Sequence, residues 1–265
     1  MGESLLLPDG FAPKYWRYWV PNAITLLACA TGLSAVHFAL KGLYGWCVIV
    51  ILVAGILDTL DGPAARALGA SSEFGAQLDS LMDLVNFGVT PSIVLYLWSL
   101  HELNWVGFAA CLVYVMCMAC RLARFNAGID FNAAQWSRSY FMGVPAPAGA
   151  FLALIPIIFS FEFPLLFQML VKAQPLALVV YTLLVGFVCI SKLPTFSSKL
   201  LNKSWLRGGK LLIVLGGVLG CIAGFVVAPW RTFLALAAVY YLSFPASYVS
   251  FRLAARRNQP VKKVK

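Results

Sequence analysis

The sequence predicts an all-α protein, a polytopic membrane bundle of about eight transmembrane helices. Hydrophobic residues make up 61% of the 265-residue chain and charged residues only 11%, which excludes an ordinary soluble domain. The apolar residues form continuous runs and do not alternate with polar ones, so a β-barrel is not expected. The cations gather in every second interval between the runs, as they do when a chain crosses a membrane back and forth.

The apolar runs are close to the ~20 residues that a helix needs to cross a bilayer. They centre on residues 22–40, 43–60, 80–100, 105–122, 146–162, 175–190, 211–227 and 231–251. The runs at 146–162 and 175–190 are short, so we expect longer or tilted helices there. The predicted organisation is an interfacial segment at 1–20, a membrane domain at 21–251 and a basic tail at 252–265.

The distribution of cations predicts the orientation. Eight spans place both termini on one side of the membrane, and that side carries seventeen of the twenty Lys and Arg residues. Only Lys41, Lys172 and Arg231 fall on the other side. By the positive-inside rule both termini and the candidate active site should face the cytoplasm. The compact size favours a bacterial inner membrane, with an archaeal membrane as the alternative. The net charge of +10 suits an anionic lipid surface and does not call for nucleic acid.

Four of the ten acidic residues fall into one pattern, D-x-x-D-G-x-x-A-R-x8-G-x3-D-x3-D, where the second run ends and the third begins. Asp58 and Asp61 are three residues apart and Asp79 and Asp83 are four apart, so each pair shares one helix face. A glycine-containing loop at about 61–79, with about 17 residues between Asp61 and Asp79, should bring the pairs together at the cytoplasmic surface. The other positions of the pattern are Gly62, Ala65, Arg66 and Gly75.

Such a cluster of carboxylates requires a cation. Two like charges ~4 Å apart repel by up to ~4 kcal/mol at an effective dielectric constant near 20. A single nearby Arg66 cannot neutralise four acids, which argues against a purely structural salt-bridge cluster. Ligation by carboxylates alone selects hard ions such as Mg²⁺, Mn²⁺ or Ca²⁺ and disfavours zinc. The sequence therefore predicts one or two divalent cations.

The small residues of the pattern indicate a phosphate-bearing ligand. Gly62, Ala65 and Gly75 carry little or no side chain, so phosphates or a nucleotide can approach the backbone there. Arg66 offers a cation to phosphate, and two metal ions can clamp a phosphorus centre during displacement. A divalent-cation transporter is the alternative from another class, because carboxylates in membrane segments often mark ion paths.

The eight positions of the pattern resemble the signature of the CDP-alcohol phosphatidyltransferases, membrane enzymes that transfer a phosphatidyl group from a CDP-linked lipid to an alcohol. The resemblance implies that Asp58, Asp61 and Asp79 bind metal, with Asp58 also near the nucleotide. It implies that Asp83 completes the cluster and acts as general base on the incoming hydroxyl.

The same resemblance implies a CDP pocket lined by Gly62, Ala65 and Gly75. It also implies a family core of six helices. Here that core would occupy about residues 21–190, and the two spans within 211–251 would be an addition to it.

Longer segments narrow the resemblance to one branch of the family. SEFGAQLDSLMDLVNFGVTPS, CRLARFNAG at 120–128, YFMGVPAPAGA at 140–150 and the early VPNAITLLACATGLSA are similar to the phosphatidylserine synthase branch. This implies transfer from CDP-diacylglycerol to L-serine, giving phosphatidylserine and CMP. Pro63, directly after Gly62, resembles the phosphatidylcholine synthase branch instead. Choline, inositol phosphate and glycerol 3-phosphate therefore stay open as acceptors.

Two arginines are candidates for the acceptor site. Arg121 and Arg124 are three residues apart at the cytoplasmic end of the fourth run. A guanidinium group can hold a carboxylate or phosphate through two parallel hydrogen bonds, whereas choline would call for an aromatic cage. We expect the pair to bind the carboxylate of serine or a lipid phosphate, with Asn126 orienting the same group. The alternative is a positive-inside anchor without a ligand.

A stripe of small residues marks the seventh run. Gly216, Gly220 and Gly224 are spaced four apart, which allows close approach of another helix. We expect that helix to belong to the same protomer, and the seam of a homodimer is the alternative.

Overall fold

The computed structural model describes residues 16–127, 140–172, 174–191, 193–196 and 210–257. The α-helices are α1 (Trp16–Leu40), α2 (Tyr44–Ala67), α3 (Glu73–Asp83), α4 (Thr90–Trp98), α5 (Asn104–Asn126), α6 (Ala146–Glu162), α7 (Pro164–Phe167), α8 (Leu176–Ile190), α9 (Lys210–Val227) and α10 (Pro229–Arg257). The other elements are the π-helices η1 (Leu84–Val89) and η5 (Gln168–Lys172), the 3₁₀-helix η2 (Leu100–Leu103) and the strands β1 (Tyr140–Met142) and β2 (Pro194–Phe196).

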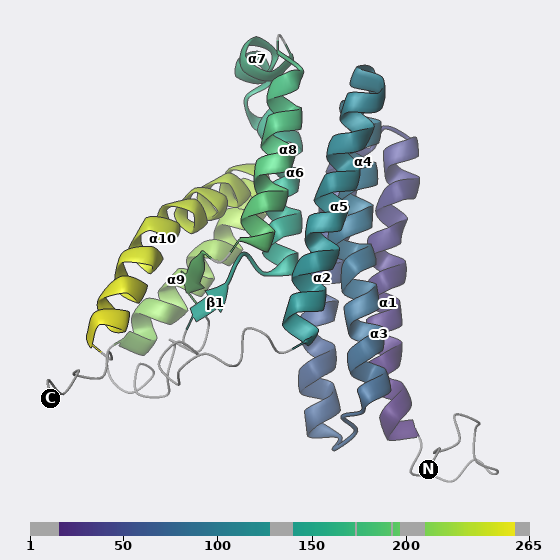
Figure 1. Cartoon of the computed structure of the whole chain (residues 1–265), viewed down its shortest axis with the longest axis vertical. Helices are drawn as coiled ribbons and strands as arrows, with labels where there is room; N and C mark the ends of the chain where they lie inside the picture. Colours follow the sequence, from purple (N-terminus) through teal and green to yellow (C-terminus); the bar gives the residue numbers. More distant parts are fainter. Residues whose placement is uncertain (1–15, 128–139, 173, 192, 197–209, 258–265) are drawn as a thin grey trace, which may run out of the picture.

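The helices form a bundle whose main members run alternately up and down (Figure 1). All eight apolar runs lie on helices. Among the described residues, five helices are long and apolar enough to cross a membrane, or six if α6 and α7, bent by 119°, count as one span. Helix α8 is apolar but has only 15 residues. The all-α membrane fold is thus confirmed, whereas the count of eight spans is not.

The connection between α2 and α3 is shorter than the sequence suggested. The predicted loop over 61–79 is wrong, because α2 continues to Ala67 and α3 begins at Glu73. Gly69 adopts a φ of +60°, the left-handed conformation that ends a helix, and the Ser72 side chain accepts a hydrogen bond from Gly75 N as the cap of α3. The acidic pairs are therefore held on regular helix.

Helices α3, η1 and α4 follow one another without a break and form one long element. The π-helical turn of η1 puts Phe87 in the core, where its side chain is fully buried. The buried Tyr114 of α5 donates a hydrogen bond from its hydroxyl to the carbonyl oxygen of Phe87 at 2.9 Å. This bond ties α5 to the irregular turn just above Asp83.

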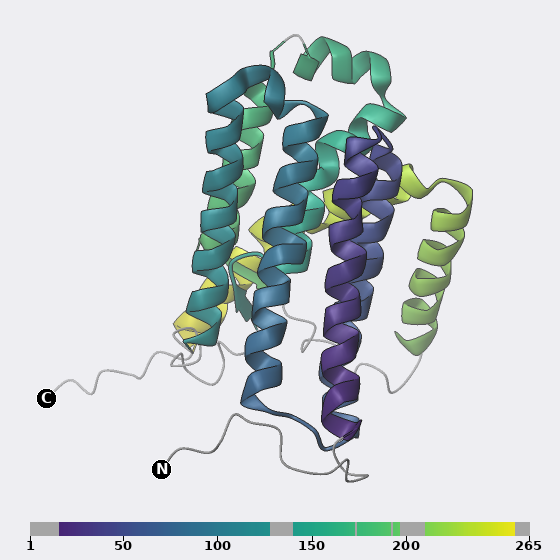
Figure 2. The ribbon, with the colours of Figure 1, turned by 90° about the vertical axis from the view of Figure 1, so that its right-hand side faces the viewer.

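The C-terminal helices α9 and α10 lie beside this bundle (Figures 1 and 2). An ion pair between Arg231 and Glu162 joins α10 to α6. Strands β1 and β2 pair antiparallel, with Tyr140 opposite Phe196, and connect the segment before α6 to the segment after α8. The start of α1 and the end of α10 both lie toward the lower end of the molecule in Figure 1.

The glycine stripe of α9 does not pack as expected. A Cβ atom at Gly224 would lie 2.7 Å from Thr232 Oγ1, so this glycine lets α9 and α10 meet at their hairpin. Gly216 and Gly220 have no described atom within 4 Å of such a position. Of the three glycines, only Gly224 makes the expected close helix contact within the protomer, because α9 lies at the edge of the molecule.

Candidate active site

The acidic cluster is built by two neighbouring helices. Asp58 and Asp61 belong to the last turns of α2, and Asp79 and Asp83 belong to α3. Helix α1 packs against both α2 and α3. One carboxylate oxygen from each of Asp58, Asp61 and Asp79 lies within 4.8 Å of the others, so the structure brings the two pairs together.

Asp83 lies at the edge of this trio, where its carboxyl group interacts with that of Asp58. The Oδ1 atoms of Asp58 and Asp83 are buried and have no hydrogen-bond partner among the described residues. Buried carboxylate oxygens without partners are costly, and a bound cation removes that cost. Because every candidate donor is a carboxylate oxygen, the residues fit a hard divalent cation held by Asp58, Asp61 and Asp79.

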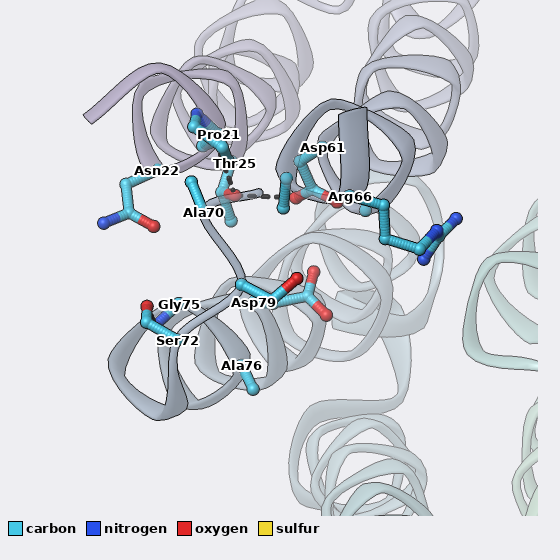
Figure 3. Close-up of a pocket in the computed structure, with 13 residues that line it drawn as sticks. Pro21, Asn22, Thr25, Asp61, Arg66, Ala70, Ser72, Gly75, Ala76 and Asp79 are labelled. Atoms are coloured by element: carbon cyan, nitrogen blue, oxygen red, sulfur yellow. Dashed lines mark hydrogen bonds between the residues drawn. The ribbon is translucent and has the colours of Figure 1, made fainter. Parts of the chain in front are cut away.

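A hydroxyl group from α1 orients one member of the trio. Thr25 donates a hydrogen bond to Oδ2 of Asp61 at 2.6 Å, and Asp61 is only 7% exposed (Figure 3). Partners of this kind fix the direction of a metal-binding carboxylate. The site therefore depends on a residue 36 positions before Asp61 in the chain.

A cavity of about 200 Å³ opens beside the cluster, between α1, α2 and the start of α3. Asp61 and Asp79 line it from facing helices, as Figure 3 shows. The non-acidic positions of the sequence pattern all line it as well: Gly62, Ala65, Arg66 and Gly75. The cavity thus joins carboxylates, one cation and small residues in one space.

The start of α3 forms one wall of this cavity. A Cβ atom at Gly75 would lie 3.2 Å from both Asn22 Oδ1 and Ser72 Oγ, so a side chain there would crowd the wall. The backbone N–H groups of a helix N-terminus attract anions, and Arg66 adds a guanidinium group on the same side. This combination suits the phosphates of a nucleotide-linked ligand next to the metal-binding carboxylates.

Some lining residues were not singled out by the sequence. Asn22 and Thr25 from α1 and Ser72 at the cap of α3 are three of them. Asn22 and Thr25 belong to the segment VPNAITLLACATGLSA, which carried part of the family resemblance but no assigned role. Ser72 directly before Glu73 is a helix-start signal that would have placed the cap.

The candidate acceptor residues make scaffold contacts and do not line this cavity. Arg121 donates a hydrogen bond from Nε to the carbonyl oxygen of Val144 at 2.5 Å, and its charge interacts with Asp83. Arg124 donates from Nη1 to the carbonyl oxygen of Ile190 at 2.8 Å, at the end of α8.

The third acceptor candidate, Asn126, bonds to α3. Its Nδ2 donates to the hydroxyl oxygen of Ser80 at 2.9 Å. Together the three residues connect the end of α5 to α3, to the start of α6 and to the end of α8. These contacts connect helices of the bundle, and both the acceptor role and the positive-inside anchor stay predictions.

Comparison with known proteins supports this picture. A CDP-diacylglycerol–serine O-phosphatidyltransferase of Mycobacterium leprae is 46% identical over 132 residues, which are 49% of this chain and 44% of that protein. A protein of the same name from Bacillus subtilis is 33% identical over 66% of this chain and 88% of that protein. Another, from Methanocaldococcus jannaschii, is 36% identical over 50% of this chain and 57% of that protein. The match thus spans less than half the length of the mycobacterial relative.

The family model described as CDP-alcohol phosphatidyltransferase matches residues 18–256. This range includes the acidic trio, the cavity and the described parts of every helix from α2 to α9. The chain therefore belongs to the CDP-alcohol phosphatidyltransferase family.

Proposed function

We propose that this protein transfers a phosphatidyl group from CDP-diacylglycerol to L-serine, giving phosphatidylserine and CMP. The observation that carries the proposal is the convergence of Asp58, Asp61 and Asp79 beside a cavity walled by small residues and Arg66. Family membership and the names of the relatives favour this chemistry and this acceptor.

In this proposal, Asp58, Asp61 and Asp79 hold one or two Mg²⁺ or Mn²⁺ ions, with Ca²⁺ as a third candidate. A divalent ion supplies positive charge to the phosphates during the displacement. Gly62, Ala65 and Gly75 make room for the CDP moiety, and Arg66 contacts its phosphates. The acyl chains stay in the bilayer, which agrees with the apolar helices around the site.

Asp83 acts as the general base. Its carboxylate accepts the proton of the serine hydroxyl, and the serine oxygen attacks the β-phosphorus of CDP-diacylglycerol. A new phosphorus–oxygen bond forms while the bond from the β-phosphorus to the bridging oxygen breaks, and CMP leaves with that oxygen. The Oδ1 atom of Asp83 supports this role, because it has no hydrogen-bond partner among the described residues and can accept one.

Arg121 is the proposed contact for the carboxylate of serine or for a lipid phosphate, because its charge is already near Asp83. Arg124 and Asn126 hold the surrounding segments in place through their bonds to α8 and α3. The excess of cations on the side of the termini supports a cytoplasmic site in a bacterial inner membrane.

The test is CMP release by the purified protein in CDP-diacylglycerol micelles. Serine, choline, inositol phosphate and glycerol 3-phosphate are offered separately, each with Mg²⁺ or Mn²⁺ and with a chelator. We expect release with serine and its loss on chelation. Release with a different alcohol would overturn the proposed acceptor, and metal flux into liposomes without CMP release would favour a transporter.

A further inference from the structure

A second cavity lies away from the carboxylates, on the side of the bundle covered by the C-terminal helices. It has a volume of about 280 Å³ and is bounded by α2, α6, α9 and α10. We call it the α6–α10 groove. Ala148 and Ile155 line it from α6, and Phe233, Ala237 and Tyr240 line it from α10.

The walls of the α6–α10 groove suit a hydrocarbon chain. Among the described residues that line the groove, Tyr240 alone has a polar side chain and none is charged. Its lining extends along α6 from Ala148 to Ile158 and along α10 from Phe233 to Tyr240. At 1.5 Å per helical residue these stretches are roughly 15 Å and 10 Å long. An elongated apolar groove of this kind fits a chain better than a compact ring.

One lining residue of the groove, Tyr240, lies within electrostatic range of Arg121, and Arg121 in turn lies within range of the proposed base Asp83. Arg121 is also bonded to the carbonyl oxygen of Val144, just before α6. The described lining of the groove on α6 begins at Ala148, four residues after Val144, so this end of the groove lies near Arg121. A lipid with its phosphates at the carboxylates can therefore direct an acyl chain toward the groove.

The two walls of the groove are held at a fixed separation. Tyr181 of α8 donates a hydrogen bond to the carbonyl oxygen of Leu152 in α6 at 2.6 Å, and its hydroxyl lies 3.1 Å from that of Tyr241 in α10. The ion pair of Arg231 with Glu162 joins the same two helices near the start of α10. The groove is thus a built feature of the contact between α6 and α10.

We propose that the α6–α10 groove holds one acyl chain of CDP-diacylglycerol during the reaction. The inference rests on the proposed function and gives a role to the two C-terminal helices, which hold no member of the acidic cluster. Lipid tails in the bilayer are as apolar as the groove walls, so an acyl chain that enters the groove gains no hydrophobic free energy. It gains van der Waals contacts and a fixed orientation. Its effect on binding should accordingly be moderate and should depend on chain length.

The first test fills the groove from α10. Ala237→Phe places a ring in the groove, and Ala238→Phe is the matched control because Ala238 is exposed and does not line it. With a long-chain CDP-diacylglycerol, Ala237→Phe should raise KM on the order of threefold to tenfold, the scale of losing several packed carbon contacts. With a dihexanoyl substrate both variants should match the wild type. Equal KM values for both variants, or an equal loss with both substrates, would overturn the proposal.

The second test does not need turnover. CDP-diacylglycerol with a photoreactive group near the end of one acyl chain is irradiated with the wild-type protein in the absence of serine, and labelled peptides are identified by mass spectrometry. We expect labels on α6 and α10 that unlabelled CDP-diacylglycerol displaces and an equal amount of phosphatidylglycerol does not. Equal displacement by phosphatidylglycerol would show a general lipid groove and overturn the assignment.

These two tests separate the inference from the proposed function. If the wild type releases no CMP with any acceptor but the groove is still labelled specifically, the transfer reaction is wrong and the acyl-chain site stands. If CMP is released with serine but neither the labels nor the KM values implicate the groove, the reaction stands and the acyl-chain site is wrong.

Discussion

The acidic cluster and the basic cluster differ in the hydrogen-bond partners that the fold gives them. In the acidic cluster, Asp58 and Asp83 each keep a buried oxygen atom without a hydrogen-bond partner among the described residues. In the basic cluster, Arg121 and Arg124 donate hydrogen bonds to backbone carbonyl groups near the start of α6 and the end of α8. Asp61 and Asp79 of the acidic cluster line a cavity, whereas Arg121 and Arg124 connect helices.

This difference separates the acidic ligand site from the scaffold contacts of Arg124, whereas Arg121 is also proposed to contact a ligand. Buried polar atoms without partners are costly, so they are expected where a ligand supplies the missing contact. The last carbonyl groups of a helix also need donors, and the guanidinium group of Arg124 supplies one to Ile190 at the end of α8. The Asp pairs and the Arg pair have similar spacings on their helices but different roles. The segments that pack against each pair determine its role.

The largest expected effect comes from Asp83→Asn, which removes the proposed base but keeps the size of the side chain. Loss of general-base catalysis should lower kcat by ~10²–10⁴-fold. Because the trio that could hold the metal does not include Asp83, the KM for CDP-diacylglycerol and the affinity for Mn²⁺ should change far less than kcat. Steady-state kinetics and metal titration measure these quantities.

The control for this variant is Glu73→Gln, an exposed acid in the first turn of the same helix. It should behave as the wild type. If Asp83→Asn keeps near-normal turnover, the base is another group. If its metal affinity falls as much as its kcat, Asp83 is a metal ligand and not chiefly a base.

A smaller effect is expected at Thr25, which orients Asp61 from α1. Thr25→Val keeps the shape of the side chain but removes the hydroxyl donor. Losing such a supporting bond typically weakens metal binding ~10–100-fold. Thr25→Ser retains the donor and should bind Mn²⁺ like the wild type. Equal metal affinities for the Val and Ser variants would show that this hydrogen bond does not support the cluster.

The acidic cluster was predictable because its signal is local. Asp58 and Asp61, and likewise Asp79 and Asp83, share helix faces at spacings that can be read in the sequence. The repulsion among these carboxylates then predicts a cation without knowledge of the fold. The apolar runs predicted the helices for a similar reason, since run length alone is informative in a membrane protein.

The rest depends on contacts between distant segments. Thr25 reaches Asp61 only because α1 packs along α2, and no spacing rule relates these residues. The span count is below eight because α6 qualifies only together with α7 across a bend of 119°, α8 has only 15 residues, and α9 is not among the five qualifying helices of the described residues. All three segments, α6, α8 and α9, are continuously apolar in the sequence. Likewise, the carbonyl partners of Arg121 and Arg124 lie 23 and 66 residues away.

The smallest expected effect concerns Arg124, whose contacts identify it as a scaffold residue. Arg124→Ala removes the hydrogen bonds to the carbonyl groups of Ile190 and Ser191 at the end of α8. Hydrogen bonds from a charged donor are worth about 1.5–3 kcal/mol, so the melting temperature should fall while the KM for serine stays within about twofold. Arg121→Ala, next to Asp83, should instead raise that KM. If Arg124→Ala raises the serine KM more than Arg121→Ala at unchanged stability, the two arginines have the opposite roles and the contrast between ligand site and scaffold fails.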